Sequence, residues 1–221
     1  MSLASCGYML GPVLKALRSR AIPFHNPYRR NRGDWNPIRH AGMLTRLRNF
    51  VRFTAGHDSE PDFGYAPFWQ SWLDLTVRCF VRGRKAEFFR IPEDKYLTAE
   101  EVADYLQPGV LEGARRGRLD WLKERLAAQY KGAIDYPLAL VARYGAEVPE
   151  PKITIGTIHS VKGGQSDNVF LLPDVPWAEA QAVAAGGSAQ DARLRRFYVG
   201  ITRARENLIL CGPSSKLRVE W

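Results

Sequence analysis

Cysteines and long apolar runs are both scarce in this chain, and their scarcity excludes several classes of protein. Cys6, Cys79 and Cys211 lie far apart and lack C-x-x-C or clustered histidine spacing, so neither a disulfide framework nor a metal site is expected. No apolar run approaches the roughly 20 residues that span a bilayer, and the N-terminus lacks the apolar core of a signal peptide. The sequence therefore predicts a soluble cytoplasmic protein with no membrane partner.

A phosphate-binding loop is also missing. The pattern G-x-x-x-x-G-K-[ST], whose backbone amides and lysine hold the β and γ phosphates of a nucleotide, does not occur, and the chain has no Gly-Lys dipeptide. An apolar run at residues 169–174 ends in Asp174, as a magnesium-binding strand does. Because Pro173 interrupts this run and no phosphate-binding loop accompanies it, a buried core strand is the better interpretation.

Acidic residues are nearly absent from the first quarter of the chain. Residues 1–56 carry ten Lys or Arg and one acid, Asp34, whereas residues 57–221 carry 22 of each sign, so the whole net charge of +9 lies in the first quarter. Such a segment suits phosphate contact with counterion release, but a solvated face or a partner-domain interface explains it equally well. The arginines that lie there among Tyr28, Trp35 and Phe50 are Arg29, Arg30, Arg32, Arg39, Arg46, Arg48 and Arg52.

The spacing of apolar residues separates the two ends of the chain from its middle. Alternating or uniformly apolar runs predict strands near both ends, and the run at residues 168–172 is of the buried parallel kind. Leu194, Phe197, Tyr198 and Ile201 follow helical spacing and predict a helix with a buried stripe. Strands are expected at residues 1–6, 22–24, 153–158, 168–172 and 207–211.

The middle of the chain reads as helical, with no competing strand alternation. Thr98 and Glu101 form the pattern of a capping box, in which each residue satisfies the other's free backbone amide. Residues 177–190 are rich in Ala and Gly and predict a loop with a weak helix. Further helices are expected after Pro12 and at residues 43–53, 67–80, 102–106 and 119–130.

This pattern predicts one parallel-sheet domain interrupted by an insertion. The sheet domain comprises residues 1–35 and 149–221, and the mainly helical insertion subdomain comprises residues 36–148. Within the insertion, basic runs at residues 82–85 and 115–118 suit duplex phosphates or solvated loops equally well. An aromatic group there could stack unpaired bases, although the core of the insertion is the better interpretation; its members are Phe63, Tyr65, Phe68, Trp69 and Trp72.

Polar and cationic groups follow the strand expected at residues 153–158. Loops after the carboxyl ends of parallel strands are the ligand-facing part of an open α/β sheet. Thr157 ends this strand, His159 and Lys162 supply hydrogen-bond donors after it, and the pair Gly163-Gly164 allows close approach of a phosphate or sugar.

A second cationic group flanks the last expected helix. Arg203 comes near the end of that helix, from where a guanidinium can reach a phosphate across a cleft and stabilise charge that develops in phosphoryl transfer. Solvation of an amphipathic helix is the alternative interpretation. The arginines of this group are Arg195, Arg196, Arg203 and Arg205.

In order and spacing, the two segments resemble motifs five and six of the superfamily-one helicases of the UvrD/Rep type. Residues 10–30 resemble, more loosely, the start of the second RecA-like domain of that family. The matching positions are Thr157, His159, Lys162, Gly163 and residues 169–172 in the first segment, then Arg195, Arg196, Tyr198, Thr202, Arg203 and Ala204 in the second.

The resemblance implies a RecA-like parallel-sheet domain, like a P-loop NTPase domain without the P-loop, that carries the family's insertion subdomain. It implies the C-terminal motor region of an ATP-dependent DNA helicase that acts in DNA repair. ATP with Mg²⁺ would be bound mainly by the N-terminal RecA-like domain of the same parent protein. The other partner would be single-stranded DNA or a junction of single and double strands, and this chain alone is expected to be inactive as an ATP hydrolase.

The resemblance also implies roles for individual residues. Arg203 would be the catalytic residue that reaches the terminal phosphate, and Gly163 and Gln165 would lie beside the nucleotide. Gln165 stands where the family usually has a glutamate that contacts the ribose, so it keeps a hydrogen bond but no charge. Thr157, His159 and Lys162 would contact the strand. No counterpart of the fourth-motif arginine is evident at residues 7–12.

Two other interpretations stay open. A non-catalytic nucleic-acid-binding module descended from a helicase would keep the strand contacts and lack hydrolysis. An unrelated α/β enzyme would carry both motifs by coincidence.

Overall fold

The computed structural model describes residues 1–38, 42–59 and 63–219. The chain divides into two compact units, one made of Met1–Pro37 and Glu150–Trp221 and the other of Ile38–Pro149. The division predicted from the sequence set its boundaries at residues 35/36 and 148/149. Arg39, one of the arginines of the basic first quarter, lies outside the described residues.

Within the described residues, the first unit contains one five-stranded sheet in the order β2-β3-β1-β4-β5. Every pair of neighbouring strands is parallel, and Ser2 in the central strand lies opposite both Ile155 and Phe170. The predicted α/β class, with a parallel sheet as in RecA-like domains, is confirmed. The strands are β1 (Ser2–Ala4), β2 (Phe24–His25), β3 (Ile153–Thr157), β4 (Ser166–Leu171) and β5 (Ala204–Leu210).

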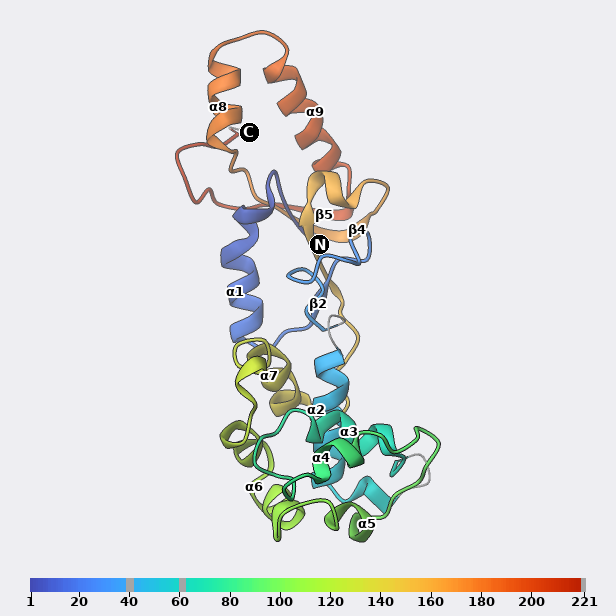
Figure 1. Ribbon diagram of the computed structural model, residues 1–221. Coiled ribbons are helices and arrows are strands. Elements are labelled where there is room, and N and C mark those ends of the chain that lie inside the picture. The colour runs from blue at the N-terminus through green and yellow to red at the C-terminus, as the bar shows by residue number, and fades with distance from the viewer. Residues whose placement is uncertain (39–41, 60–62, 220–221) are drawn as a thin grey trace. The chain divides into compact units, whose positions relative to one another are not determined.

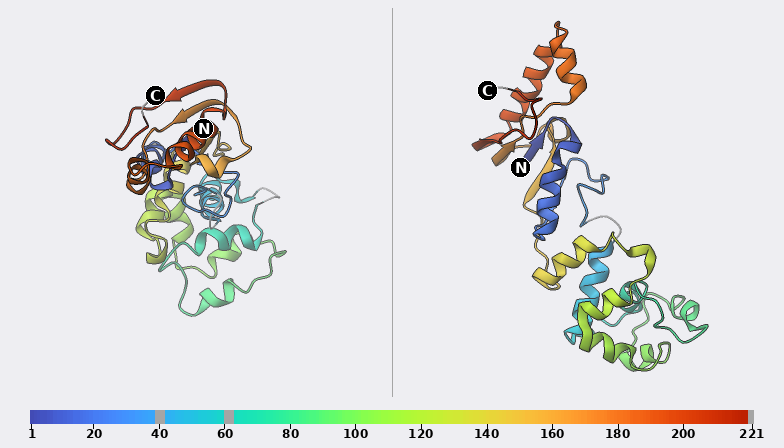
Figure 2. Two further views of the ribbon diagram at one scale, coloured as in Figure 1. Left: turned by 90° about the horizontal axis from the view of Figure 1, so that it is seen from above. Right: turned by 90° about the vertical axis from the view of Figure 1, so that its left-hand side faces the viewer.

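The helices of this unit extend from the sheet in two directions. The hairpin of α8 and α9, orange to red, leaves the sheet opposite to α1, in blue (Figure 1 and Figure 2). Pro12 stands in the first turn of α1, where its missing amide costs nothing. The elements are η1 (Gly7–Leu10), α1 (Gly11–Ser19), η5 (Ile158–Val161), α8 (Trp177–Ala184) and α9 (Ala189–Ile201).

At strand β4, the core of the first unit packs against one face alone. Val169 and Leu171 of β4 are fully buried, whereas Phe170 between them is 44% exposed. The expected uniformly buried strand is therefore wrong, because only the alternate side chains of β4 enter the core. The buried cluster consists of Leu3, Ile158, Val161, Val169, Leu171, Val175, Phe197 and Val219.

Helix α9 packs on this core through its second half alone. Phe197 and Gly200 are buried, but Leu194 is 50% and Tyr198 67% exposed, so the expected continuous buried stripe is wrong. Gly200 allows the close approach, since a methyl group there would lie 3.1 Å from Leu171 Cδ1. The first half of α9 pairs instead with α8, a full helix where a loop with a weak helix was expected.

In the second unit, helix α2 is central and contacts α3, α6 and α7. Phe53 and Trp72 stack with ring centroids 5.0 Å apart, and Trp69 and Trp72 are fully buried. Most of the aromatic group is therefore the core of this unit. The elements are α2 (Met43–Thr54), η3 (His57–Ser59), α3 (Ala66–Leu73), α4 (Arg84–Phe88), α5 (Ala99–Ala103), α6 (Val110–Glu124), η4 (Ala128–Tyr130) and α7 (Asp135–Tyr144).

Two predictions that were made for the second unit from local sequence patterns had different outcomes. The capping box at Thr98 is confirmed, with the Thr98 amide 2.8 Å from Glu101 Oε2 and the Glu101 amide 3.2 Å from Thr98 Oγ1. The helix expected at residues 119–130 is wrong in extent, because α6 ends at Glu124. Arg118 has non-helical dihedrals (φ 48°, ψ −132°) and kinks α6 just before the expected start. No helix in the described part of the chain is long and apolar enough to cross a membrane.

Candidate functional site

The first matched segment begins where β3 ends. The Ser160 amide donates to Thr157 Oγ1 (3.2 Å) and the Ser160 hydroxyl donates to the Thr157 carbonyl (2.8 Å), so Thr157 caps the short helix η5. Ile158 and Val161 point into the core, which leaves His159 exposed between them. His159 is the one exposed residue of η5, so its imidazole faces solvent.

Residues 161–164 form a tight turn that presents Lys162. The Gly164 amide donates to the Val161 carbonyl (2.8 Å), Lys162 has φ −55° and ψ 127°, and Gly163 has φ +86°. These values are those of a type II turn, which requires a positive φ at its third residue and therefore favours glycine at 163. Lys162 occupies the second position and is exposed, as is Gln165 just after the turn.

The register of the sheet places the two halves of this segment at different edges. Thr157 lies opposite Ala4 at the carboxyl end of β3, whereas Ser166 opens β4 opposite Ala204 at the start of β5. Because all the strands are parallel, residues 158–165 run from the carboxyl edge back to the amino edge. The expectation that the whole loop lies at the carboxyl edge is therefore wrong for its glycine half.

Arg203 lies at the end of α9 and is half-buried. Its Nε donates to the Val199 carbonyl (2.9 Å), and Nη2 donates to Thr202 Oγ1 (3.0 Å). Its Nη1 donates to the carbonyl of Gly164 (3.3 Å). A guanidinium has five N–H donors, so these contacts fix its plane and leave two donors for another acceptor.

The two matched segments therefore meet at the amino edge of β4 and β5. The Arg203 side chain contacts Gly164, and the Ser166 amide donates to the Arg203 backbone carbonyl (2.9 Å). Of the residues singled out from the sequence, Gly163, Gln165 and Arg203 lie about this junction. Thr157 and His159 precede it at the other end of η5.

The remaining arginines of the second segment have local partners. Arg196 pairs with Glu179 and joins α9 to α8. Arg205 pairs with Asp167 at 3.2 Å, and Arg195 is exposed, with its Nε 3.4 Å from the Asp191 carbonyl. In the contacts of the described residues, Arg203 is the one of these four whose side chain contacts the turn at residues 161–164.

Sequence reasoning missed a turn that follows β2. Asn26 is fully buried, and its Nδ2 donates to the Ile155 carbonyl (2.7 Å) and to Ser160 Oγ (3.3 Å). The Tyr28 ring packs on Gly164, because a methyl group there would lie only 2.1 Å from Tyr28 Oη. The Asn26-Pro27 pair is a turn signal that could have pointed to this segment.

Asp174 has a structural environment. Its Oδ1 accepts the backbone amides of Ser214 (3.0 Å) and Ser215 (2.8 Å), and its side chain is buried. Desolvation raises the pKa of this carboxyl, but the hydrogen bonds from Ser214 and Ser215 outweigh it and hold the pKa below its ordinary value. These contacts favour the interpretation of residues 169–174 as a core strand, with Asp174 after it held by hydrogen bonds to Ser214 and Ser215.

Residues 139–214 match the family model described as the UvrD-like helicase C-terminal domain. The match includes both segments that meet at Gly164, and it confirms the predicted resemblance. Over these residues the chain is therefore similar to the C-terminal domain of UvrD-like helicases. No curated protein and no solved structure matches the chain.

Proposed function

We propose that the chain is the C-terminal motor region of an ATP-dependent helicase that translocates on single-stranded DNA. In this proposal it supplies an arginine finger and strand contacts, and the N-terminal RecA-like domain of the same parent protein binds most of ATP and Mg²⁺. The proposal draws support from the family match and from the absence of G-x-x-x-x-G-K-[ST] in the chain.

The arginine finger in this proposal is Arg203. When bound, ATP supplies the phosphoryl group and Mg²⁺ neutralises part of its charge. The two unused donors of Arg203 suit a terminal phosphate oxygen, because the contacts to Val199, Thr202 and Gly164 already hold the guanidinium plane. Gln165, exposed beside Gly164, suits a hydroxyl of the ribose. The space beside Gly163 is open, since a methyl group there would meet no atom within 4 Å.

The strand contacts in this proposal come from η5 and the turn after it. His159 and Lys162 are exposed and three residues apart, so both can meet successive groups of a strand. The Thr157 hydroxyl oxygen accepts the Ser160 amide, and the hydroxyl proton can still be donated to a strand. Lysine and imidazole donors at such positions suit phosphate oxygens.

The observation that carries the proposal is that Arg203 contacts the same turn that presents Lys162. Arg203 Nη1 donates to the Gly164 carbonyl (3.3 Å), and Lys162 lies two residues before Gly164 in that turn. A phosphate bound by the two unused donors of Arg203 would therefore be linked through Gly164 to the segment that contacts the strand. Coupling of this kind is what a motor needs between nucleotide state and strand affinity.

The test combines the chain with the P-loop domain of its parent protein. We expect ATP hydrolysis, stimulated by single-stranded DNA, only in the combination, and each half alone should be inactive. His159→Ala and Lys162→Ala should weaken binding of a labelled single strand, whereas Lys15→Ala, an exposed lysine on α1, should not. Turnover by this chain alone at ordinary motor rates, lost in Arg203→Ala and therefore not due to a contaminating enzyme, would contradict the proposal.

The absent phosphate-binding loop also favours a second candidate, a nucleic-acid-binding module without catalysis. This candidate predicts strand binding through His159 and Lys162 and no hydrolysis in any combination. The same pair of measurements therefore distinguishes the two functions.

A further inference from the structure

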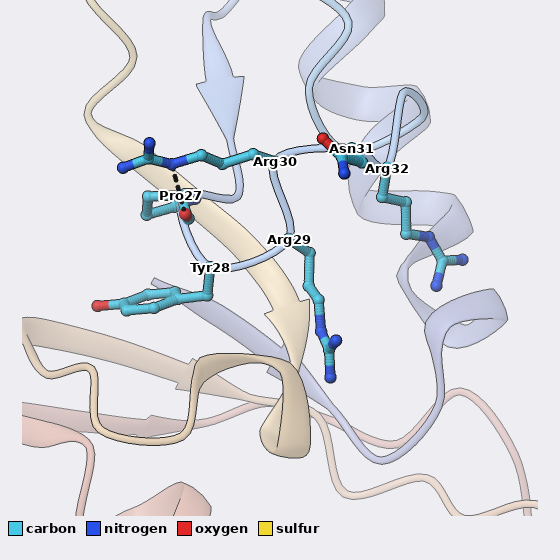
Figure 3. Close-up of a pocket in the computed structure, with 6 residues that line it drawn as sticks. All are labelled: Pro27, Tyr28, Arg29, Arg30, Asn31 and Arg32. Atoms are coloured by element: carbon cyan, nitrogen blue, oxygen red, sulfur yellow. Dashed lines mark hydrogen bonds between the residues drawn. The ribbon is translucent and has the colours of Figure 1, made fainter.

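An open hollow of about 670 Å³ lies beside the turn that follows β2. Figure 3 shows Tyr28 and Arg30 on the same side of this turn, whereas Arg29 and Arg32 extend away from them. We call residues 26–32 the Asn26 turn. The residues that line the hollow are Pro27, Tyr28, Arg29, Arg30, Asn31 and Arg32.

Two buried asparagines fix the backbone of the Asn26 turn. The Oδ1 of Asn26 accepts the amides of Tyr28 (3.0 Å) and Arg29 (2.9 Å), and Asn36 Nδ2 donates to the carbonyls of Arg29 (2.9 Å) and Arg32 (3.0 Å). The Asn26 amide in turn donates to Asn36 Oδ1 (2.9 Å). A turn held by five such bonds keeps its shape without a ligand, which lowers the entropic cost of binding one.

The cations of the Asn26 turn differ in what neutralises them. Arg32 pairs with Asp34 at 3.0 Å and lies over the Trp35 ring, 3.9 Å from its centroid. Arg30 donates from its Nε to the Pro27 carbonyl (3.3 Å). Within the described residues no carboxylate pairs with Arg29 or Arg30, and both are exposed. Two guanidinium groups on a fixed backbone are therefore available to an anion.

The turn is joined to the first matched segment. Asn26 bonds to Ser160 of η5, and the Tyr28 ring rests on Gly164 while its other side is open, with the residue 45% exposed. An extended polyanion that contacts His159 and Lys162 thus finds the next positive charges on the Asn26 turn. The exposed ring of Tyr28 gives a base a surface on which to stack.

We propose that the Asn26 turn is a phosphodiester-binding site for a nucleic-acid strand, in which Arg29 and Arg30 bind the backbone phosphates and Tyr28 contacts a base. The site rests on the strand binding in the proposed function and extends it to residues outside both matched segments. Guanidinium forks match phosphate oxygens in pairs, so the predicted contact is with phosphate and is independent of base sequence.

The test measures binding of a fluorescent single strand of about 20 thymidines, longer than a typical site. Each phosphate contact contributes about 0.7 to the slope of log affinity against log salt, so Arg29→Gln/Arg30→Gln should lower the slope by about 1.4. The matched control is Lys15→Gln/Lys216→Gln, which removes the same charge from two exposed lysines of the same unit. Circular dichroism melts of both variants check that the fold is kept.

An unchanged slope in the arginine variant, or equal losses in the variant and its control, would overturn the site. Binding of inorganic phosphate by the wild-type chain, with no binding of the labelled strand, would also overturn the site. If the arginine variant binds the strand as wild type does, while His159→Ala and Lys162→Ala weaken binding, the site is wrong and the proposed function stands. If the arginine variant alone weakens binding, the site stands and the strand role of the first segment falls.

Discussion

The ring of Tyr28 lies directly on the backbone of Gly164. A methyl group added at Gly164 would lie 2.1 Å from Tyr28 Oη and 2.4 Å from Cζ, whereas one added at Gly163 would meet no atom within 4 Å. Gly163 has instead a φ of +86°, a conformation that side chains disfavour. The two neighbouring glycines are therefore required for different reasons, one for space and the other for backbone shape.

This difference makes a matched pair of variants. We expect Gly164→Ala to displace the Tyr28 ring, and with it the Asn26 turn, because the overlap is too deep for the neighbour to absorb. Gly163→Ala should cost about 1 kcal/mol in backbone strain and leave Tyr28 in place. Nuclear magnetic resonance of labelled tyrosine rings reports the position of Tyr28, and identical Tyr28 signals in the two variants would contradict the packing described.

Arg203→Lys should separate hydrolysis from strand binding. Lysine keeps the charge but cannot hold the Val199 and Gly164 carbonyls and a phosphate oxygen together, because it lacks the planar fork. In the combined motor we expect kcat for ATP to fall by about 10³-fold, the lower end of the range for an arginine finger, with strand affinity nearly unchanged. Equal losses of hydrolysis and of strand affinity would mean that Arg203 acts in folding.

Strand positions were within reach of sequence reasoning, because they depend on short-range patterns, whereas the meeting of the two motifs was expected only from their resemblance to the helicase family. The alternation at residues 153–158 gave β3 to within one residue, and the runs at residues 168–172 and 207–211 became β4 and β5. The burial of each strand depends on its neighbours. Phe170 reads as core in sequence but lies on the face of β4 away from the core.

The contacts that complete the candidate site come from distant parts of the chain and leave no local signal. Asn26 reaches Ser160 and Tyr28 reaches Gly164 only because β2 pairs with β3. Similarly, the stripe at residues 119–130 continues in sequence, yet α6 ends at Glu124 and Leu126 pairs with Thr76 instead. Tertiary packing overrode helical propensity at that point.

The aromatic core of the second unit gives a stability prediction. Trp72 is fully buried and contacts Phe50 and Phe53, so Trp72→Ala should lower the free energy of unfolding by about 3–5 kcal/mol. Tyr65, 43% exposed, is the matched control, and its replacement by alanine should cost far less. Urea denaturation measures both. A Trp72→Ala chain as stable as wild type would instead support the base-stacking interpretation of this aromatic group.

Asp174 gives the first unit a predictable response to acid. Hydrogen bonds from Ser214 and Ser215 outweigh desolvation and hold the folded-state pKa of Asp174 below its ordinary value. A carboxyl with a depressed folded pKa contributes stability above its unfolded pKa of about 3.9, and this contribution is lost as the pH falls through the folded pKa. The sign follows because protonation removes the charge that the two backbone amides stabilise.

We therefore expect Asp174→Asn to lower the free energy of unfolding by about 1.5–3 kcal/mol at neutral pH, the range for hydrogen bonds to a charged group. The gap between variant and wild type should narrow below about pH 4, since the wild-type carboxyl then becomes neutral as well. Glu206→Gln, an exposed carboxylate on β5, is the matched control and should change stability little at either pH. A gap for Asp174→Asn that stays constant from neutral to acid pH would mean that the backbone amides of Ser214 and Ser215 do not stabilise a charged carboxylate.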